Sequence, residues 1–369
     1  MIQRYKYRSK VDEKLINTNK SAPGIKPDEV GTFEVATNYP DQLKKSTGTV
    51  LIFFQGIQIK HGREDSIGNS PMSWLEETLF ASSEELPEKA AKLPIEHTAC
   101  KLGFNHFITF SFPDNLTAEG FSVSMKNLLN YLDRNNFTAV IVSFSNGATL
   151  VAEWLLNLLL QQSFEVLSLF VKNVLQTVCA GCLFEPKDLE LKAYLTGKYF
   201  AKPLSRPLSN IPFVEKQFFI RRAGGPADLI NRVRYLYSLK NFDHNRNIEK
   251  TSWTKAREIL KIFPEFQLIF LADQGQRIVL PSGSIKWYQL LHRHFPKNVQ
   301  GYIAKNVKTG WINYPSAVHH EIKHLWTLIS ILGTSIKLRN ELNYNTMALQ
   351  IADEWPKRRF TLMNDKNQT

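Results

Sequence analysis

The sequence is poor in cysteine, and its hydrophobic runs are short and interrupted. Its 369 residues include only 3 cysteines, too few for a disulfide framework, and the odd number leaves at least one without a partner in the chain. The most apolar stretch, 154–171, contains Asn157, Gln161, Gln162 and Glu165, whereas a membrane-spanning helix needs roughly 20 predominantly apolar residues. Internal repeats and low-complexity tracts are also missing. These absences exclude a small disulfide-stapled domain and argue against a transmembrane protein.

A secretory signal is not visible at the start of the sequence. Residues 1–15 alternate charged with single apolar side chains and lack the apolar core of roughly 7 to 15 residues that such a signal contains. We therefore expect a cytoplasmic location. Hydrophobic residues make up 43% of the chain, enough for a conventional core. The formal net charge of +12 favours acidic partners without naming one.

Three short segments are continuously β-branched and aromatic. They are 49–54, 106–112 and 137–143, and polar or turn residues end the first two. Such runs are typical of strands buried on both faces of a sheet. Between the second and third, residues 118–135 carry apolar side chains at helical spacing. The order strand, helix, strand predicts a parallel sheet with right-handed crossovers.

The same pattern continues to the C-terminal part of the chain. We expect further strands at 171–179 and 266–272, and helices at 146–161, 284–295 and 319–332. The fold class predicted is α/β, a mostly parallel central sheet flanked by helices, with an inserted helical lid. The predicted divisions are an N-terminal extension or peripheral hairpin (1–47), a first core part (48–182), the lid (183–264), a second core part (265–353) and a polar tail (354–369).

The end of the third strand carries the most informative residues. Ser145 has a small residue, Ser143, two positions before it and Gly147 two positions after it, and an apolar helix follows. Small residues at these positions permit a tight turn from strand to helix, which lifts the Ser145 hydroxyl above the sheet. The helix directs its free N–H groups and positive end toward the same point. This arrangement suits a nucleophile whose attack creates an oxyanion.

At this point the chain resembles the α/β-hydrolase family, whose nucleophile turn has the pattern G-x-S-x-G. The departure is Ser143 in place of the first glycine. The family also has an oxyanion loop after an earlier core strand, and Gln55 and Gly56 end the strand 49–54. The resemblance therefore implies an oxyanion hole formed by the backbone N–H groups of Asn146 and Ile57. A competing choice for that loop is His61 with Gly62.

The family order of nucleophile, acid and histidine directs attention to two later segments. Asp273 directly follows the strand 266–272, as the family's acid does, and His319 opens the helix 319–332. The resemblance implies that Asp273 orients the imidazole of His319, the general base, with His320 as its rival. It also implies a serine hydrolase acting on an ester or related acyl bond, with no cofactor. A catalytically inactive hydrolase fold that serves as a binding protein is a second hypothesis.

A metal site is the third hypothesis. The sequence HEIKH at 320–324 satisfies H-E-x-x-H, in which His320 and His324 would bind zinc one helical turn apart. It resembles the zincin metallopeptidases, and Glu341 could act as a third ligand. Lys323 places a cation beside the ligands, and the parallel α/β pattern differs from that of a zincin. The hydrolase interpretation is therefore favoured, with no metal.

The predicted lid suggests a more specific partner than the net charge does. It combines aromatic side chains with Arg221, Arg222, Arg232 and Arg234, which predicts an acyl substrate with an apolar chain and an anionic portion, such as a phospholipid or an acyl thioester of a phosphate-bearing carrier. The basic clusters permit peripheral contact with an anionic membrane, and no nucleic-acid-binding signature accompanies them. The aromatic residues concerned are Phe184, Tyr194, Tyr199, Phe200, Phe213, Phe218, Phe219, Tyr235, Tyr237, Phe242, Trp253 and Phe263.

Overall fold

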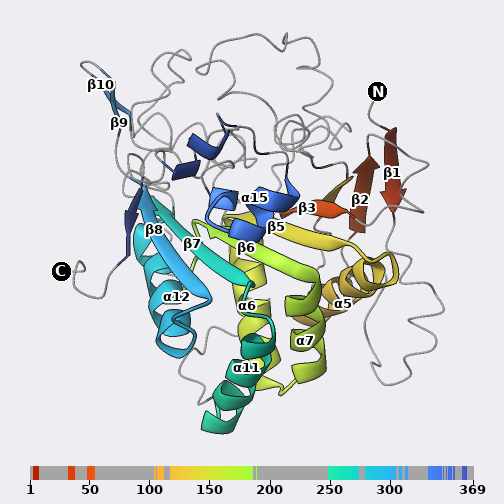
Figure 1. The fold of residues 1–369 in the computed structure, drawn as a ribbon. Coiled ribbons are helices and arrows are strands. Elements are labelled where there is room, and N and C mark those ends of the chain that lie inside the picture. Colours follow the sequence, from red (N-terminus) through yellow and green to blue (C-terminus); the bar gives the residue numbers. More distant parts are fainter. Residues whose placement is uncertain are drawn as a thin grey trace, which may run out of the picture.

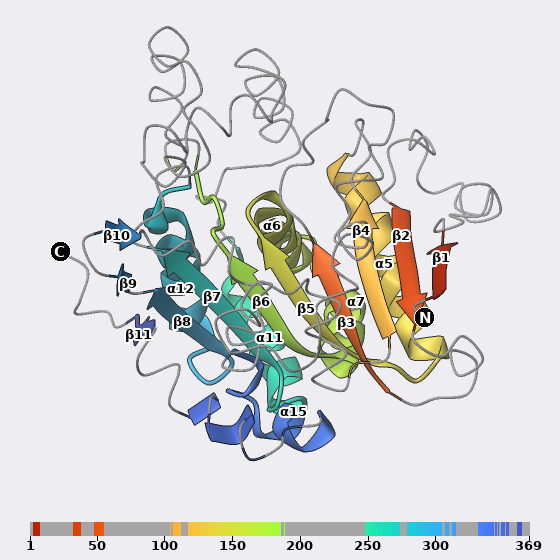
Figure 2. The ribbon, with the colours of Figure 1, turned by 90° about the horizontal axis from the view of Figure 1, so that it is seen from above.

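The described part of the chain folds around one nine-stranded sheet in the computed structural model (Figure 1). The strand order is β1-β2-β4-β3-β5-β6-β7-β8-β11, and Figure 2 shows most of these strands side by side. The strands are β1 (Gln3–Tyr7), β2 (Thr32–Thr37), β3 (Thr49–Phe54), β4 (His106–Ser111), β5 (Thr138–Phe144), β6 (Val174–Ala180), β7 (Gln267–Asp273), β8 (Val299–Ala304) and β11 (Phe360–Leu362).

The structure describes only part of the chain. The described residues are 3–7, 32–37, 48–54, 104, 106–111, 117–185, 188, 248–273, 279–304, 307–309, 312–314, 331–342, 344, 346, 348–350, 352–353 and 360–363.

The centre of the sheet is parallel. Strands β4, β3, β5, β6, β7 and β8 run in one direction, while β1, β2 and β11 pair antiparallel with their neighbours. The predicted α/β class with a mostly parallel central sheet is confirmed. The segments β1 and β2 form an antiparallel pair at one edge, within the range 1–47 for which an extension or a peripheral hairpin was predicted. A separate two-stranded pair joins β9 (Val307–Thr309) to β10 (Ile312–Tyr314).

Helices cover both faces of the sheet. On one face, alternate strand residues such as Ile52, Ile141 and Phe270 pack against the longer helices, and on the other face Leu51, Val142 and neighbouring residues pack against the region around α15. Figure 1 shows α15 on the side of the sheet opposite the other helices. The helices are α5 (Ala118–Arg134), α6 (Asn146–Leu160), α7 (Phe164–Asn173), α11 (Lys250–Ile262), α12 (Pro281–His294) and α15 (Ile336–Glu341).

One predicted strand begins later than expected. The sequence indicated a strand over 171–179, but α7 continues to Asn173 and β6 starts at Val174. Residues Leu167, Phe170 and Val171 are buried at helical spacing. A short apolar run fits either element, and here packing against α5, α6 and α11 selects the helix.

The predicted lid, 183–264, does not extend as far as residue 264, because its C-terminal part belongs to the core. Helix α11 lies against α6 and α7, and it buries Trp253, Ala256 and Leu260 in the main core. Trp253 and Phe263, counted above among the lid aromatics, therefore belong to the helical layer on the sheet. The parallel connection from β6 to β7 requires such a crossover helix. The rest of the predicted lid lies largely outside the described residues.

The predicted polar tail, 354–369, contains a strand of the sheet. Strand β11 pairs antiparallel with β8, and the Met363 N–H donates to the Gly301 carbonyl at 2.9 Å. Phe360 and Met363 are both buried. The prediction of a polar tail is wrong for 360–363, because these two apolar side chains pack against β8 and α12.

Candidate active site

Ser145 lies at the junction of β5 and α6, in a backbone conformation that is sparsely populated. Its φ is 53° and its ψ is −122°, a region that costs a non-glycine residue on the order of 1–3 kcal/mol. The Ser145 N–H donates to the Ala180 carbonyl at 2.7 Å. The Ser145 carbonyl accepts from the N–H and the hydroxyl of Thr149, at 3.0 and 2.9 Å. These bonds hold the sharp turn predicted from the sequence, with Ser145 partly exposed at the carboxyl edge of the sheet.

Ser143 occupies the position where the family pattern has glycine, and the structure accommodates it. Its hydroxyl donates to the Val178 carbonyl at 2.7 Å and lies 3.5 Å from the Cys179 sulfur, on the neighbouring strand β6. The side chain is fully buried. Serine therefore adds a bond between β5 and β6 and leaves the turn intact.

Asn146 is the first residue of α6, so its backbone N–H has no acceptor within the helix. The first turn of α6 carries no acidic side chain that would compensate the positive end of the helix dipole. The N–H of Asn146 thus lies at the N-terminus of α6 beside Ser145, and its role as an oxyanion donor stays a prediction. Its side chain is buried, and Oδ1 accepts no hydrogen bond within the described structure. The other predicted donor, Ile57, and its rival His61 lie outside the described residues.

Asp273 ends β7, two strands away from β5 in the sheet. It pairs in register with Ala304 of β8. Because the carboxyl ends of parallel strands meet at one edge, the structure brings the backbones of Ser145, Asn146 and Asp273 to the same edge. The predicted bases, His319 and His320, lie outside the described residues, so their placement stays a prediction.

Comparisons with known proteins give no family. A scan against protein-family models found no match, and neither did a search of curated proteins. Among solved structures, the chain is similar to an esterase from Rhizomucor miehei, with 11% identity, a TM-score of 0.42, and coverage of 92% of this chain and 82% of that chain. Carboxyl esterase 2 from Tuber melanosporum gives 13% identity, a TM-score of 0.38, and coverage of 85% and 82%. Prolyl oligopeptidase B from Galerina marginata gives 13% identity, a TM-score of 0.39, and coverage of 94% and 37%. Likenesses this weak leave function to the chain's own geometry.

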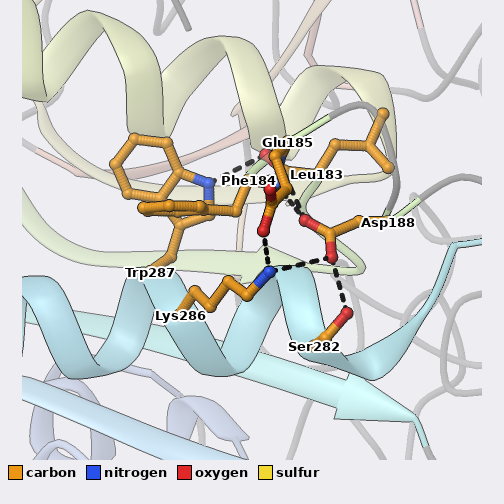
Figure 3. Close-up of polar contacts among 7 residues, drawn as sticks. All are labelled: Leu183, Phe184, Glu185, Asp188, Ser282, Lys286 and Trp287. Atoms are coloured by element: carbon orange, nitrogen blue, oxygen red, sulfur yellow. Dashed lines mark hydrogen bonds and ion pairs between the residues drawn. The ribbon is translucent and has the colours of Figure 1, made fainter. Parts of the chain in front are cut away.

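A second carboxylate, Asp188, follows β6 and was not singled out from the sequence. Its Oδ2 accepts from the N–H groups of Phe184 and Glu185, at 3.1 and 2.8 Å. Its Oδ1 accepts from the Ser282 hydroxyl at 2.6 Å and lies 3.5 Å from the Lys286 nitrogen (Figure 3). Both oxygens are therefore occupied, which disfavours Asp188 as the group that orients a catalytic imidazole. The available sequence signal was the pair Ser282 and Lys286, four residues apart on α12.

The described residues do not support the zinc hypothesis with a cluster of ligands. Glu341, its suggested third ligand, ends α15, where its Oε2 accepts from the Thr49 hydroxyl at 3.0 Å. Thr49 starts β3, so Glu341 lies at the amino edge of the sheet, opposite the edge that carries Ser145. His320 and His324 are outside the described residues. Within the described ranges no group of three or more His, Cys, Asp and Glu side chains is arranged to hold a metal ion.

The helices of the described structure also bear on membrane insertion. None of its helices combines the length and the apolar character that crossing a bilayer requires.

Proposed function

We propose that this chain is a serine hydrolase of the α/β-hydrolase type that cleaves an ester or related acyl bond. The observation that carries the proposal is the conformation of Ser145, φ 53° and ψ −122°, between a buried parallel strand and a helix N-terminus. A strained serine in this position is the arrangement in which α/β hydrolases carry their nucleophile. Strain of this kind persists only where the surrounding structure imposes it, and it gathers at functional sites.

The proposed reaction proceeds through an acyl-enzyme. The Ser145 hydroxyl oxygen attacks the acyl carbon while His319, or its rival His320, takes the hydroxyl proton. The N–H groups of Asn146 and Ile57 stabilise the oxyanion that forms, and one such donor is worth about a hundredfold or more in rate. The histidine then protonates the leaving group, and water activated by the same imidazole hydrolyses the acyl-enzyme. Asp273 holds the imidazole in the required orientation.

A fluorophosphonate probe tests the proposal directly. We expect the wild-type chain to be labelled at Ser145 and to hydrolyse short p-nitrophenyl esters, and Ser145→Ala to do neither. Ser163→Ala is a matched control, because Ser163 precedes α7 with an ordinary φ of −79°. Labelling retained in Ser145→Ala, or a wild-type chain that does not react, would overturn the assignment. The second result would favour the catalytically inactive binding protein.

A further inference from the structure

The segment that leaves β6 contacts the Ser145 turn directly. We call residues 180–185 and 188 the β6 exit segment. Its first residue, Ala180, accepts the Ser145 N–H at 2.7 Å. Three residues later, the Leu183 N–H donates to the Thr149 hydroxyl at 3.0 Å, and that hydroxyl donates to the Ser145 carbonyl at 2.9 Å. Both backbone polar groups of Ser145 are thus tied to this segment, one of them through Thr149.

The same segment holds both ends of the connection between β7 and α12. At one end, the Gly181 N–H donates to the Leu271 carbonyl at 3.0 Å. At the other end, the Leu280 N–H donates to the Asp188 carbonyl at 2.7 Å. Asp273, the proposed acid, lies between these two anchored positions in the chain. One segment therefore connects the two elements that carry Ser145 and Asp273.

The β6 exit segment is itself fixed by Asp188 (Figure 3). The carboxylate is only 1% exposed. It binds two N–H groups of its own segment, from Phe184 and Glu185, and the Ser282 hydroxyl of α12. Lys286 of α12 pairs with both Glu185 and Asp188. A carboxylate is the one acceptor that can satisfy all of these donors at once, because each of its oxygens accepts more than one hydrogen bond.

Packing between α12 and the segment is equally close. The Trp287 indole N–H donates to the Leu183 carbonyl at 2.9 Å. A Cβ atom on Gly283 would lie 2.1 Å from the Cys182 carbonyl oxygen. Helix α12 therefore meets the segment at a distance that only glycine permits, and the fit leaves little room for the segment to shift.

From these contacts we infer that Asp188 is a positioning residue, which locks the β6 exit segment between the Ser145 turn and the ends of the Asp273 connection. The inference rests on the proposed function. Loss of the carboxylate removes the acceptor of two part-buried N–H groups and of the Ser282 hydroxyl, and the anchors at Leu271 and Leu280 loosen with the segment. Displacement of a catalytic group by about 1 Å can cost as much as a hundredfold in rate.

The test uses the full chain with Asp188→Asn and a milder variant, Ser282→Ala, which removes only one bond to the carboxylate. Asp133→Asn is the control, because it breaks the exposed ion pair with Lys172, at 2.9 Å, between α5 and α7. Three quantities are measured: hydrogen exchange of peptides covering 143–150 and 271–284, the rate of fluorophosphonate labelling, and the pH dependence of kcat/KM.

We expect Asp188→Asn to exchange faster in both peptides and to label roughly tenfold to a hundredfold more slowly. The kcat should fall with little change in KM. The acid limb of kcat/KM should move to lower pH, because an imidazole that loses its carboxylate partner has a lower pKa. Ser282→Ala should give smaller changes in the same direction, and Asp133→Asn none. If Asp188→Asn does not fold, Ser282→Ala carries the test.

Two results would overturn the inference while the proposed function stands. One is that the folded variants exchange hydrogen and react with the probe at the same rates as the wild-type chain. The other is a drop in labelling that is fully explained by the fraction of the variant that is unfolded, with an unchanged pH profile of kcat/KM. That result would indicate a purely structural role for Asp188. A wild-type chain that never labels would overturn the proposed function, and the positioning role with it.

Discussion

At the scale of single residues, Ser145 combines the proposed chemistry with backbone strain. Glycine adopts its φ of 53° without a steric penalty. We expect Ser145→Gly to remove labelling and yet raise the free energy of unfolding by about 1 kcal/mol, because relief of roughly 1–3 kcal/mol of strain exceeds the entropic cost of a glycine. Urea denaturation measures this change.

The control for this prediction is Ser163→Gly. Ser163 has a φ of −79°, so its backbone carries no strain that glycine could relieve. Ser163→Gly should therefore lower the free energy of unfolding by about 0.5–1 kcal/mol, the entropic cost of glycine. If Ser145→Gly were destabilised to the same extent, the turn would not be strained, and the observation that carries the proposed function would lose its force.

At the scale of elements, β11 covers the last edge of the parallel sheet. Phe360 and Met363 are buried, and the Tyr288 hydroxyl of α12 donates to the Met363 carbonyl at 2.9 Å. Removing residues 360–369 exposes the edge of β8 and loses the burial of two large apolar side chains, each worth about 1.5–3 kcal/mol. We expect the free energy of unfolding to fall by about 3 kcal/mol, as measured by urea denaturation.

Removal of 364–369 alone is the matched control for that truncation. It leaves β11 and the Met363 contacts in place, so stability should stay within about 0.5 kcal/mol of the full chain. Equal stability of the two truncated chains would mean that β11 contributes nothing to the fold.

At the scale of the whole molecule, the net charge of +12 bears on the substrate. We propose that the acyl substrate carries an anionic portion, and that Arg221 and Arg222 help to bind it. Replacing both by glutamine should lower kcat/KM for an anionic ester by about tenfold, the worth of one charge-assisted hydrogen bond. A neutral ester of equal chain length should be unaffected.

A salt series and a second double variant are the controls for the predicted preference for an anionic ester. High salt should reduce the preference for the anionic ester, because the screening length between exposed charges falls to about 3 Å at 1 M salt. Glutamine at Lys357 and Arg358 lowers the net charge equally at a different place in the chain and should leave the preference unchanged. Equal effects of the two double variants would make the net charge, and not a local arginine pair, responsible.

The sequence by itself determined the features that depend on residues close together in the chain. Buried parallel strands such as β3 and β5 were predictable because a continuous apolar run needs cover on both faces. The turn at Ser145 was predictable because small residues around a serine, followed by an apolar helix, leave few other conformations. The position of Asp273 at the end of β7 followed from the same reasoning.

The tertiary structure decided what depends on contacts between distant residues. The sequence predicted α11 as part of the lid, but packing against α6 and α7 places it in the core. It predicted β11 as part of a polar tail, but pairing with β8 makes it a strand of the sheet. Ser143 fits the turn because the Val178 carbonyl, 35 residues later, accepts its hydroxyl. The role of Asp188 depends on Ser282, 94 residues away. No local pattern encodes such pairs, because a buried polar group is stabilised by whichever partner the fold brings within hydrogen-bond distance.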